Sequence, residues 1–481
     1  MTVTINETKN VQMILDMDAS ELAEAIKQKK ISSFEATKTY IEHLKMMNPK
    51  LNCLTEDRFD EALEEAKQMD RQIEIQQGKG RLLGVPISIK ESFHVMGMKT
   101  TGGLPYRKHI VETNDAAIVA NLKAEGAIIL GKTNTPALCF CQETDNKLYG
   151  RTNNPWDVTR TAGGSSGGEG SLIAAGGAAV GVGSDIGGSI RFPSHFNGVV
   201  GFKSGNGQVS SEGSFPLNDI PLQKRMLGIG AIGKSVRDAR NVNEIIAKAI
   251  PEKRNLQQFS VVMPIRKLYY PINSDTHSLL LHIKEKIEDH FPVSDEQPPY
   301  YTKSALLWQL IMSIDGAARI ARTAFGENPP KLLREYMKEK LLKGSELHQY
   351  LTWAMIGANL FKPSSKKIAE MEATIKEGDE QLRQYFNKRL LILPIYHTAA
   401  LKHGQVYHEL FSIRKTYQRY IPFVAYANVW GLPALVVPVG EDENGLPIAI
   451  QIISGIGNED AIFQFGEIIE QHFRGYKRCV F

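Results

Sequence analysis

The sequence contains little cysteine, and its four thiols are far apart. Cys53, Cys139, Cys141 and Cys479 are too few and too dispersed to form a disulfide framework. The Cys-x-Cys pair also lacks the second group of ligands that a zinc site needs. We therefore expect a protein of a reducing compartment, with a cytoplasmic location and no bound metal.

Long apolar runs are also missing. The segment MTVTINETKN at the start has neither the basic nor the apolar part of a secretory leader. Nowhere does an uninterrupted apolar stretch approach the roughly 18 residues that a membrane-spanning helix needs. The sequence thus predicts no membrane anchor.

A strong excess of one charge is missing as well. The 481 residues carry 57 basic and 53 acidic side chains, a formal net charge of +4, and the basic residues are scattered without interleaved aromatics. Because nucleic-acid surfaces need a basic stripe, we expect no nucleic-acid partner. The hydrophobic content of 42% is that of an ordinary globular protein, with a core large enough to enclose a site.

Helices are predicted near the N-terminus. Residues 18–29 place apolar side chains at helical spacing, and Ser32-Ser33-Phe34-Glu35 resembles a capping box that opens a second helix. We expect N-terminal helices within residues 1–80.

An α/β pattern follows along the chain. Strand-like runs at 84–89 and 127–130 flank a helical segment at 115–125, which is the pattern of a βαβ unit. Strand-like runs return at 434–437 and 447–453. This alternation predicts a sheet covered by helices.

Two segments between these runs have unusual compositions. Residues 163–188 hold 11 glycines interleaved with aliphatic side chains, which is typical of tightly turning buried backbone rather than of a flexible linker. Residues 275–390 are lysine-rich, with Glu, Lys, Leu and Ile recurring at helical intervals. We expect this second segment to be a helical insertion that covers the substrate side of a common core.

Two motifs imitate nucleotide-binding loops. Gly126–Thr133 matches the phosphate-loop pattern, but its four variable positions are apolar and indicate a strand, which cannot curl around a phosphate. Gly228–Gly233 fits the dinucleotide fingerprint, but residues 221–227 before it make a poor buried strand. We expect neither motif to bind a nucleotide. Thermal stabilisation of the protein by ATP would instead favour nucleotide binding at Gly126–Thr133.

A pair of serine-containing glycine turns carries the chemistry. Thr161–Gly168 places hydroxyls between glycine pairs, and Ser184–Arg191 is a second glycine turn that contains Ser189. A serine nucleophile needs an activating base, and the oxyanion that it creates needs donors already aimed at it. Consecutive N–H groups of a Gly-Gly turn can supply those donors.

The identity of the base is the open point. The serine elbow Gly-x-Ser-x-Gly is not satisfied around Ser189, because position 191 is Arg. His195 is the nearest histidine, and a buried structural role is its simpler interpretation. Lys90 ends an apolar strand, where burial lowers the pKa of an amine and lets a lysine act as a base.

At these residues the sequence resembles the amidase signature family. The resemblance lies in the run from Gly163 to Lys203 together with Lys90, and in motifs that occur in family order: Gly131–Asn134, Gly150–Trp156, Gly431–Ala434 and Gly445–Gln451. It covers most of the chain apart from the helical segment. It implies one amidase domain over residues 1–481, with an α/β fold in which helices cover both faces of a single large, mixed and twisted sheet.

The resemblance also implies the roles of individual residues. Ser189 is the nucleophile, Ser165 is a serine with a cis peptide bond that relays protons, and Lys90 is the base. The backbone N–H groups of Ile186, Gly187, Gly188 and Ser189 form the oxyanion hole. Three further residues support these turns: Ser166, which bonds the lysine or holds its loop, and Asp185 and Arg191. No metal or cofactor is required.

The implied activity is hydrolysis of a small-molecule amide to the acid and ammonia or an amine. Gly168-Glu-Gly170 and Asp185–Ser194 resemble the fatty-acid amide hydrolase branch more than the glutaminase subunit of tRNA-dependent amidotransferases. We therefore expect a free-standing amidase for small or medium acyl groups, for which the resemblance allows a homodimer. The glutaminase subunit is the alternative, and it would need a partner chain.

Two further features of the sequence bear on the expected activity. A non-catalytic binding protein on the same scaffold is disfavoured, because all three catalytic positions are filled. Four positions near the expected substrate side depart from the usual family pattern: Ser204, Gln208, Ala231 and Lys234.

Overall fold

One mixed β-sheet forms the centre of the molecule. The computed structural model describes residues 2–411 and 419–480. Within them, 11 strands have the order β1-β3-β2-β4-β6-β5-β10-β11-β9-β7-β8. The strands are β1 (Leu54–Asp57), β2 (Pro86–Lys90), β3 (Ile128–Thr133), β4 (Val180–Asp185), β5 (Val200–Lys203), β6 (Gly228–Gly233), β7 (Ser260–Val262), β8 (Val293–Ser294), β9 (Arg389–Pro394), β10 (Ala434–Glu441) and β11 (Pro447–Ile453).

The strand pairing confirms the predicted α/β architecture. Strands β2 and β3 are parallel neighbours joined through helix α5 (Ala117–Ala124), which is the predicted βαβ unit. Strand β4 is also parallel to β2, whereas β6, β5, β10 and β11 pair antiparallel with one another in turn. The predicted C-terminal strands are β10 and β11, so both runs are confirmed.

Helices cover both faces of the sheet, as β5 demonstrates. Side chains of consecutive strand residues point to opposite faces. A Cβ on Gly201 would lie against Ser194 of helix α7 (Arg191–Asn197). The ring of Phe202 instead packs against Phe463 of helix α19 (Glu459–His472), with centroids 4.6 Å apart and the ring planes tilted. Helix α6 (Gly167–Ala174) packs beside α7, and α9 (Val236–Ile246) packs beside α19.

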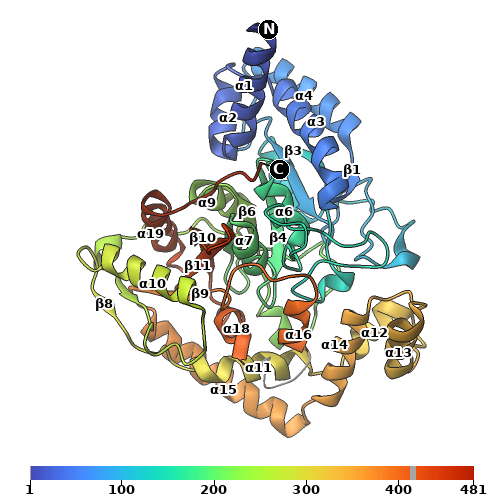
Figure 1. Cartoon of the computed structure of the whole chain (residues 1–481), viewed down its shortest axis with the longest axis vertical. Helices are drawn as coiled ribbons and strands as arrows, with labels where there is room; N and C mark the ends of the chain where they lie inside the picture. The colour runs from blue at the N-terminus through green and yellow to red at the C-terminus, as the bar shows by residue number, and fades with distance from the viewer. Residues whose placement is uncertain (1, 412–418, 481) are drawn as a thin grey trace.

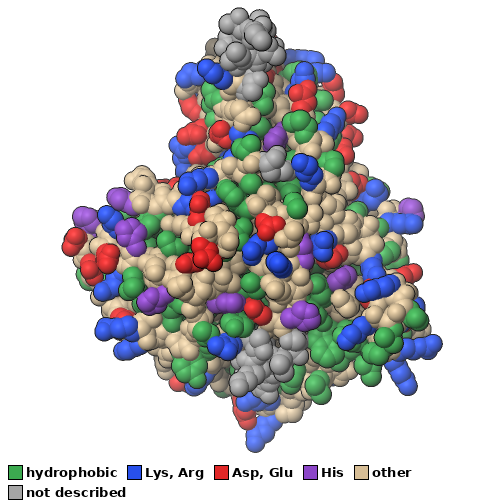
Figure 2. Space-filling view, viewed as in Figure 1, with side chains coloured by type: hydrophobic (Ala, Val, Ile, Leu, Met, Phe, Trp, Pro, Cys, Tyr) green, Lys and Arg blue, Asp and Glu red, His purple; other side chains and the backbone are tan. Residues whose placement is uncertain are grey.

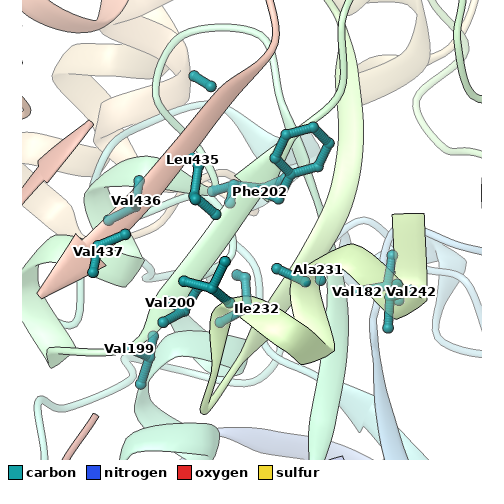
Figure 3. Close-up of a cluster of buried hydrophobic side chains, with 14 of the residues drawn as sticks. Val182, Val199, Val200, Phe202, Ala231, Ile232, Val242, Leu435, Val436 and Val437 are labelled. Atoms are coloured by element: carbon teal, nitrogen blue, oxygen red, sulfur yellow. The ribbon is translucent and has the colours of Figure 1, made fainter. Parts of the chain in front are cut away.

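The core is continuous across the central strands. Figure 3 shows Val200 and Phe202 of β5, Ile232 of β6, Leu435 of β10 and Val242 of α9 within one cluster of buried side chains. All five side chains are buried. Because each strand contributes aliphatic side chains to this layer, the hydrophobic effect holds the central strands as a rigid platform for the loops at their ends.

Helices α1 (Thr2–Asp16), α2 (Ala19–Lys27), α3 (Ser33–Leu51) and α4 (Phe59–Glu74) form one end of the molecule (Figure 1). The two helices predicted from apolar spacing are α2 and α3. Ser32 accepts a hydrogen bond from the Glu35 amide, but the Glu35 side chain bonds Asn10 instead of closing the box. The complete capping box is at the start of α2, between Asp18 and Glu21.

The lysine-rich segment is mostly helical. It contains α10 (Ser274–Ile287), α11 (Tyr301–Met312), α12 (Ala318–Phe325), α13 (Leu332–Leu342), α14 (Gln349–Leu360) and α15 (Ser365–Tyr385). Helix α10 links β7 to the parallel edge strand β8, and the helices from α11 to α15 lie at the end of the molecule opposite α1–α4 (Figure 1). The other α-helices in the described ranges are α8 (Pro221–Lys224), α16 (Gln405–Phe411) and α18 (Pro422–Val429).

The surface shows no large area of one charge on the face seen in Figure 2, where acidic and basic side chains are interspersed. This agrees with the scattered charges in the sequence. Of the helices in the described ranges, none combines the length and the apolar character needed to cross a membrane.

Candidate active site

Two parallel strands carry the predicted lysine and the predicted nucleophile to one edge of the sheet. Lys90 is the last residue of β2, and Ser189 follows β4 in the turn before α7. Since β2 and β4 are parallel neighbours, their carboxyl ends lie at the same edge, where α/β proteins commonly bind ligands. Ser165 reaches this edge from the loop that precedes α6.

The structure brings Lys90 and Ser165 into direct contact. Lys90 Nζ lies 2.7 Å from Ser165 Oγ and 3.1 Å from Ser184 Oγ. The lysine is fully buried, and burial lowers its pKa more than the nearby Cys139, Asp185 and Glu169 raise it. A lowered pKa favours the neutral amine, which is the form that can accept a proton.

The loop around Ser165 is fixed by its neighbours. The peptide bond between Gly164 and Ser165 is cis, and the Ser165 carbonyl accepts a 2.9 Å hydrogen bond from Thr135 Oγ1. The Ser166 amide donates to the Ser189 carbonyl at 3.1 Å, and Ser166 Oγ donates to the Ser184 carbonyl at 3.4 Å. These bonds join the loop around Ser165 to the turn that contains Ser189.

The turn from 185 to 191 is organised by one buried carboxylate. Asp185 Oδ1 accepts the Gly188 amide at 2.8 Å, and Asp185 Oδ2 accepts the Ile190 amide at 3.1 Å. Of the four amides expected in an oxyanion hole, that of Gly188 is thus engaged within the protein. The amides of Ile186, Gly187 and Ser189 have no acceptor in the described part of the chain.

A buried ion pair supports this carboxylate. The Arg191 guanidinium forks onto Asp185, with Nε to Oδ2 and Nη2 to Oδ1 both at 3.0 Å. Asn428 also donates to Asp185 at 2.8 Å, and Gln451 accepts from Arg191 at 2.8 Å. Burial alone would raise the pKa of Asp185, but the charge and hydrogen bonds of Arg191 hold it well below the usual value. Asp185 and Arg191 therefore hold the turn in a fixed conformation.

A mostly apolar cavity of about 120 Å³ opens beside these serines. Ser165, Ser184 and Ser189 line one part of it. Its apolar lining comes from two regions of the chain: Leu138, Phe140, Ile186, Phe215, Leu217, Ile220 and Leu227 from the core loops, and Met312, Ala317 and Ile320 from the helical segment. Arg319 of α12 also lines the cavity and pairs with Asp219, and both side chains are about half exposed.

His195 is a structural residue in this fold. Its ring is fully buried, with Nε2 at 3.0 Å from the Thr398 carbonyl and Nδ1 accepting the Ala449 amide at 3.0 Å. Burial lowers its pKa to about 4. Because both ring nitrogens are occupied by backbone groups, neither is available to activate Ser189.

The two nucleotide-like motifs are strands. The apolar part of Gly126–Thr133 lies in β3, as predicted, and buried Lys132 donates to Thr100 Oγ1 at 2.8 Å rather than facing a loop. Gly228–Gly233 is β6 itself, which pairs antiparallel with β4.

Three residues of the site were missed by sequence reasoning. Cys139 lines the cavity and interacts with Lys90, Gln142 donates to the Gly187 carbonyl at 3.0 Å, and Trp308 donates to the Ile186 carbonyl at 2.7 Å. Trp308 is more than 100 residues away along the chain, and no local motif marks it. Cys139 and Gln142 follow the Gly-Lys-Thr-Asn motif closely, which was a signal that could have drawn attention to them.

The chain is similar to known proteins over most of its length. A family profile described as Amidase matches residues 35–463. The fatty-acid amide hydrolase 2-A of Danio rerio is 32% identical over 96% of this chain and 90% of its own length. A glutamyl-tRNA(Gln) amidotransferase subunit of Acaryochloris marina is 29% identical over 93% of this chain and 96% of its own length. The structure of 6-aminohexanoate cyclic dimer hydrolase with substrate matches 97% of this chain and 100% of that chain, with a TM-score of 0.80 and 22% identity.

Proposed function

The chain belongs to the amidase signature family, and on that premise we propose that it is a serine amidase acting through Ser189, Ser165 and Lys90. The observation that carries the proposal is the 2.7 Å contact between Lys90 Nζ and Ser165 Oγ, at the wall of the cavity that Ser189 also lines. A buried neutral amine beside a serine hydroxyl can act as the general base, so no histidine is needed for that role.

Acylation begins with proton transfer along this row. Neutral Lys90 accepts the Ser165 hydroxyl proton, and Ser165 Oγ takes the proton of Ser189. Ser189 Oγ then forms a bond to the amide carbon, and the carbonyl oxygen becomes an oxyanion. The amides of Ile186, Gly187 and Ser189 are the donors available to stabilise it, since Asp185 holds the fourth.

The same row returns its protons to the leaving group. Ser165 donates its proton to the departing nitrogen as the carbon–nitrogen bond breaks, and Lys90 then restores the Ser165 proton. This step matters because an amine is a poor leaving group until it is protonated. Water next attacks the acyl-enzyme and gives a proton to the same relay, which returns a proton to Ser189 Oγ as the acyl–oxygen bond breaks and the carboxylic acid leaves.

The lining of the cavity favours the binding of amides with an apolar acyl group. Aliphatic and aromatic side chains dominate its lining, and its charged groups are Asp219, Asp315 and Arg319. Burial of apolar surface there would stabilise a bound acyl chain by roughly 25 cal/mol per Å². Met312, Ala317 and Ile320 in the lining support a role for the helical segment as the substrate-side cover.

The test is ammonia or amine release from a panel of amides with short aliphatic, aromatic and long acyl groups, plus glutamine. Ser189→Ala is run in parallel. We expect apolar amides to be turned over and the variant to lose turnover. Turnover that survives in Ser189→Ala would contradict the assigned nucleophile. Activity on glutamine alone, and only with a partner chain added, would select the amidotransferase function, since the chain is also similar to that kind of protein.

A further inference from the structure

The indole of Trp308 binds the backbone of the oxyanion turn from outside the cavity. Trp308 lies on α11 and donates from Nε1 to the Ile186 carbonyl at 2.7 Å. Its ring also lies close against the next residue, since a Cβ on Gly187 would come within 2.6 Å of Trp308 Cζ2. Glycine at 187 is therefore what allows the indole to reach this carbonyl.

This contact sets the direction of a catalytic amide. In a trans peptide unit the carbonyl and the following N–H point in opposite directions within one plane. The Ile186 carbonyl points to Trp308. Ile186 and Ser189 line the cavity, whereas Trp308 is not among its lining residues. The Gly187 N–H of the same unit must therefore point away from the indole, toward the side where the oxyanion would form.

The next peptide unit is held in a matching way. Gln142 Nε2 donates to the Gly187 carbonyl at 3.0 Å, and Asp185 accepts the Gly188 amide at the other end of that unit. Two carbonyls and one amide of the turn are thus fixed by side chains from three separate segments. A backbone so fixed needs little reorganisation when charge develops on the substrate.

Helix α11 is itself held in place beside the core. It packs against α18, next to which it lies in Figure 1. Trp430, just after α18, donates from its indole Nε1 to Ser304 Oγ on the same helix at 3.0 Å. Trp308 and Trp430 thus make comparable indole hydrogen bonds at α11, but only that of Trp308 reaches the turn.

We propose that Trp308 is a positioning residue for the oxyanion hole, and that with Gln142 it holds the peptide units of Ile186 and Gly187 in the orientation that catalysis requires. This inference rests on the proposed serine amidase function. It gives the lysine-rich helical segment a part in the chemical step in addition to its contribution to the cavity wall.

The test compares Trp308→Phe with Trp430→Phe. Each variant keeps an aromatic ring and loses one indole hydrogen bond at α11. We expect Trp308→Phe to lower kcat by about 10- to 100-fold, below the 10²- to 10³-fold cost of losing an oxyanion donor outright. KM should stay within about twofold. The loss should be equal for an ester and an amide with the same acyl group, since both pass through an oxyanion.

Further readouts separate positioning from a loss of structure. The pH profile of kcat/KM should be unchanged in Trp308→Phe, because Lys90 and Ser165 are not altered. Trp430→Phe should lose comparable thermal stability but keep kcat within about threefold. Gln142→Leu removes the neighbouring contact from outside α11 and should also lower kcat at constant KM, which keeps a test available if Trp308→Phe does not fold.

The outcomes are distinguishable from failure of the proposed function. If the wild-type protein shows no turnover that depends on Ser189, the proposed function itself fails. If the wild type is active but neither Trp308→Phe nor Gln142→Leu loses more kcat than Trp430→Phe, the positioning role is overturned. A kcat loss confined to the amide would also overturn it, because that pattern belongs to the proton relay.

Discussion

The carboxyl group of Glu169 lies against strand β2, which ends in Lys90, and it accepts a 2.6 Å hydrogen bond from Ser88 Oγ of that strand. Thr133 Oγ1 donates to its other oxygen at 2.9 Å. Burial raises the pKa of Glu169 to about 7, although both hydrogen bonds act in the opposite direction. Its charge in turn raises the pKa of Lys90. The pKa of Lys90, the proposed base, thus depends on a carboxyl group with which it makes no hydrogen bond.

Glu169→Gln should shift the acid limb of kcat/KM to lower pH. Ionised Glu169 stabilises protonated Lys90, so its removal makes the neutral amine available at lower pH. The expected shift is a fraction of a unit to about one unit. The measurement is a pH–rate profile of both proteins on one amide. An unmoved limb, or one moved upward, would contradict the coupling.

Lys90→Ala should lower amide turnover by about 10²- to 10⁴-fold and ester turnover by clearly less. An alkoxide can leave without prior protonation, whereas an amine cannot. The check is a pair of substrates that share one acyl group. Lys132→Met is the matched control, because Lys132 is also a buried lysine on the adjacent strand but bonds Thr100 instead of a serine of the site. Equal losses on both substrates would remove Lys90 from leaving-group protonation.

Thiol alkylation should inactivate the enzyme through Cys139. This thiol lines the cavity and interacts with Lys90, so a bulky adduct would occupy the small space beside the serines. Burial raises the pKa of the other three thiols, that of Cys479 to about 11, which disfavours their reactive thiolates. We expect Cys139→Ala to keep turnover and to resist iodoacetamide. Equal sensitivity of Cys139→Ala and wild type would place the reactive thiol elsewhere.

Asp185→Asn should lower the free energy of unfolding by about 3–5 kcal/mol, because it leaves the buried Arg191 charge without its partner. The pKa of Asp185 is lower in the folded state than in the unfolded state. Its contribution to the free energy of unfolding is therefore present above the unfolded-state pKa and is lost as the pH falls toward the folded-state pKa. The gap in melting temperature between variant and wild type should therefore shrink below about pH 4.

Asp379→Asn provides the comparison for this buried pair. Asp379 pairs with Arg225 at 2.6 Å, but its side chain is 37% exposed. A solvent-exposed pair contributes at most about 1 kcal/mol. A variant at Asp185 no less stable than the one at Asp379 would show that the Arg191 pair does not support the turn.

Local patterns in the sequence predicted most of the scaffold correctly. Apolar runs at 84–89 and 127–130 became β2 and β3, because a strand buried on both faces needs continuous aliphatic residues. The capping box at Ser32 was only half correct, since Asn10 competes for the Glu35 carboxylate. That competitor lies on a different helix, and helical periodicity says nothing about contacts between helices.

The site divides in a similar way. Lys90, Ser165 and Ser189 could be proposed from the sequence because each lies in a local motif, a strand end or a glycine turn. Trp308 was not recognisable, because its contribution depends on how α11 packs beside the turn. The engagement of the Gly188 amide by Asp185 was equally hidden, since a Gly-Gly turn predicts available donors but not which of them an adjacent carboxylate occupies.

The origin of Trp308 in the helical segment limits how the gene can be recombined. The cavity wall continues beyond it, through Met312, Ala317 and Ile320. A crossover placed after Trp308 would exchange this wall for that of another lineage while retaining the indole that holds the turn. A crossover before Trp308 would place the donor's residue against Gly187. A new cavity wall could then be acquired with a functional turn only if the donor has a residue compatible with Gly187 at the position of Trp308.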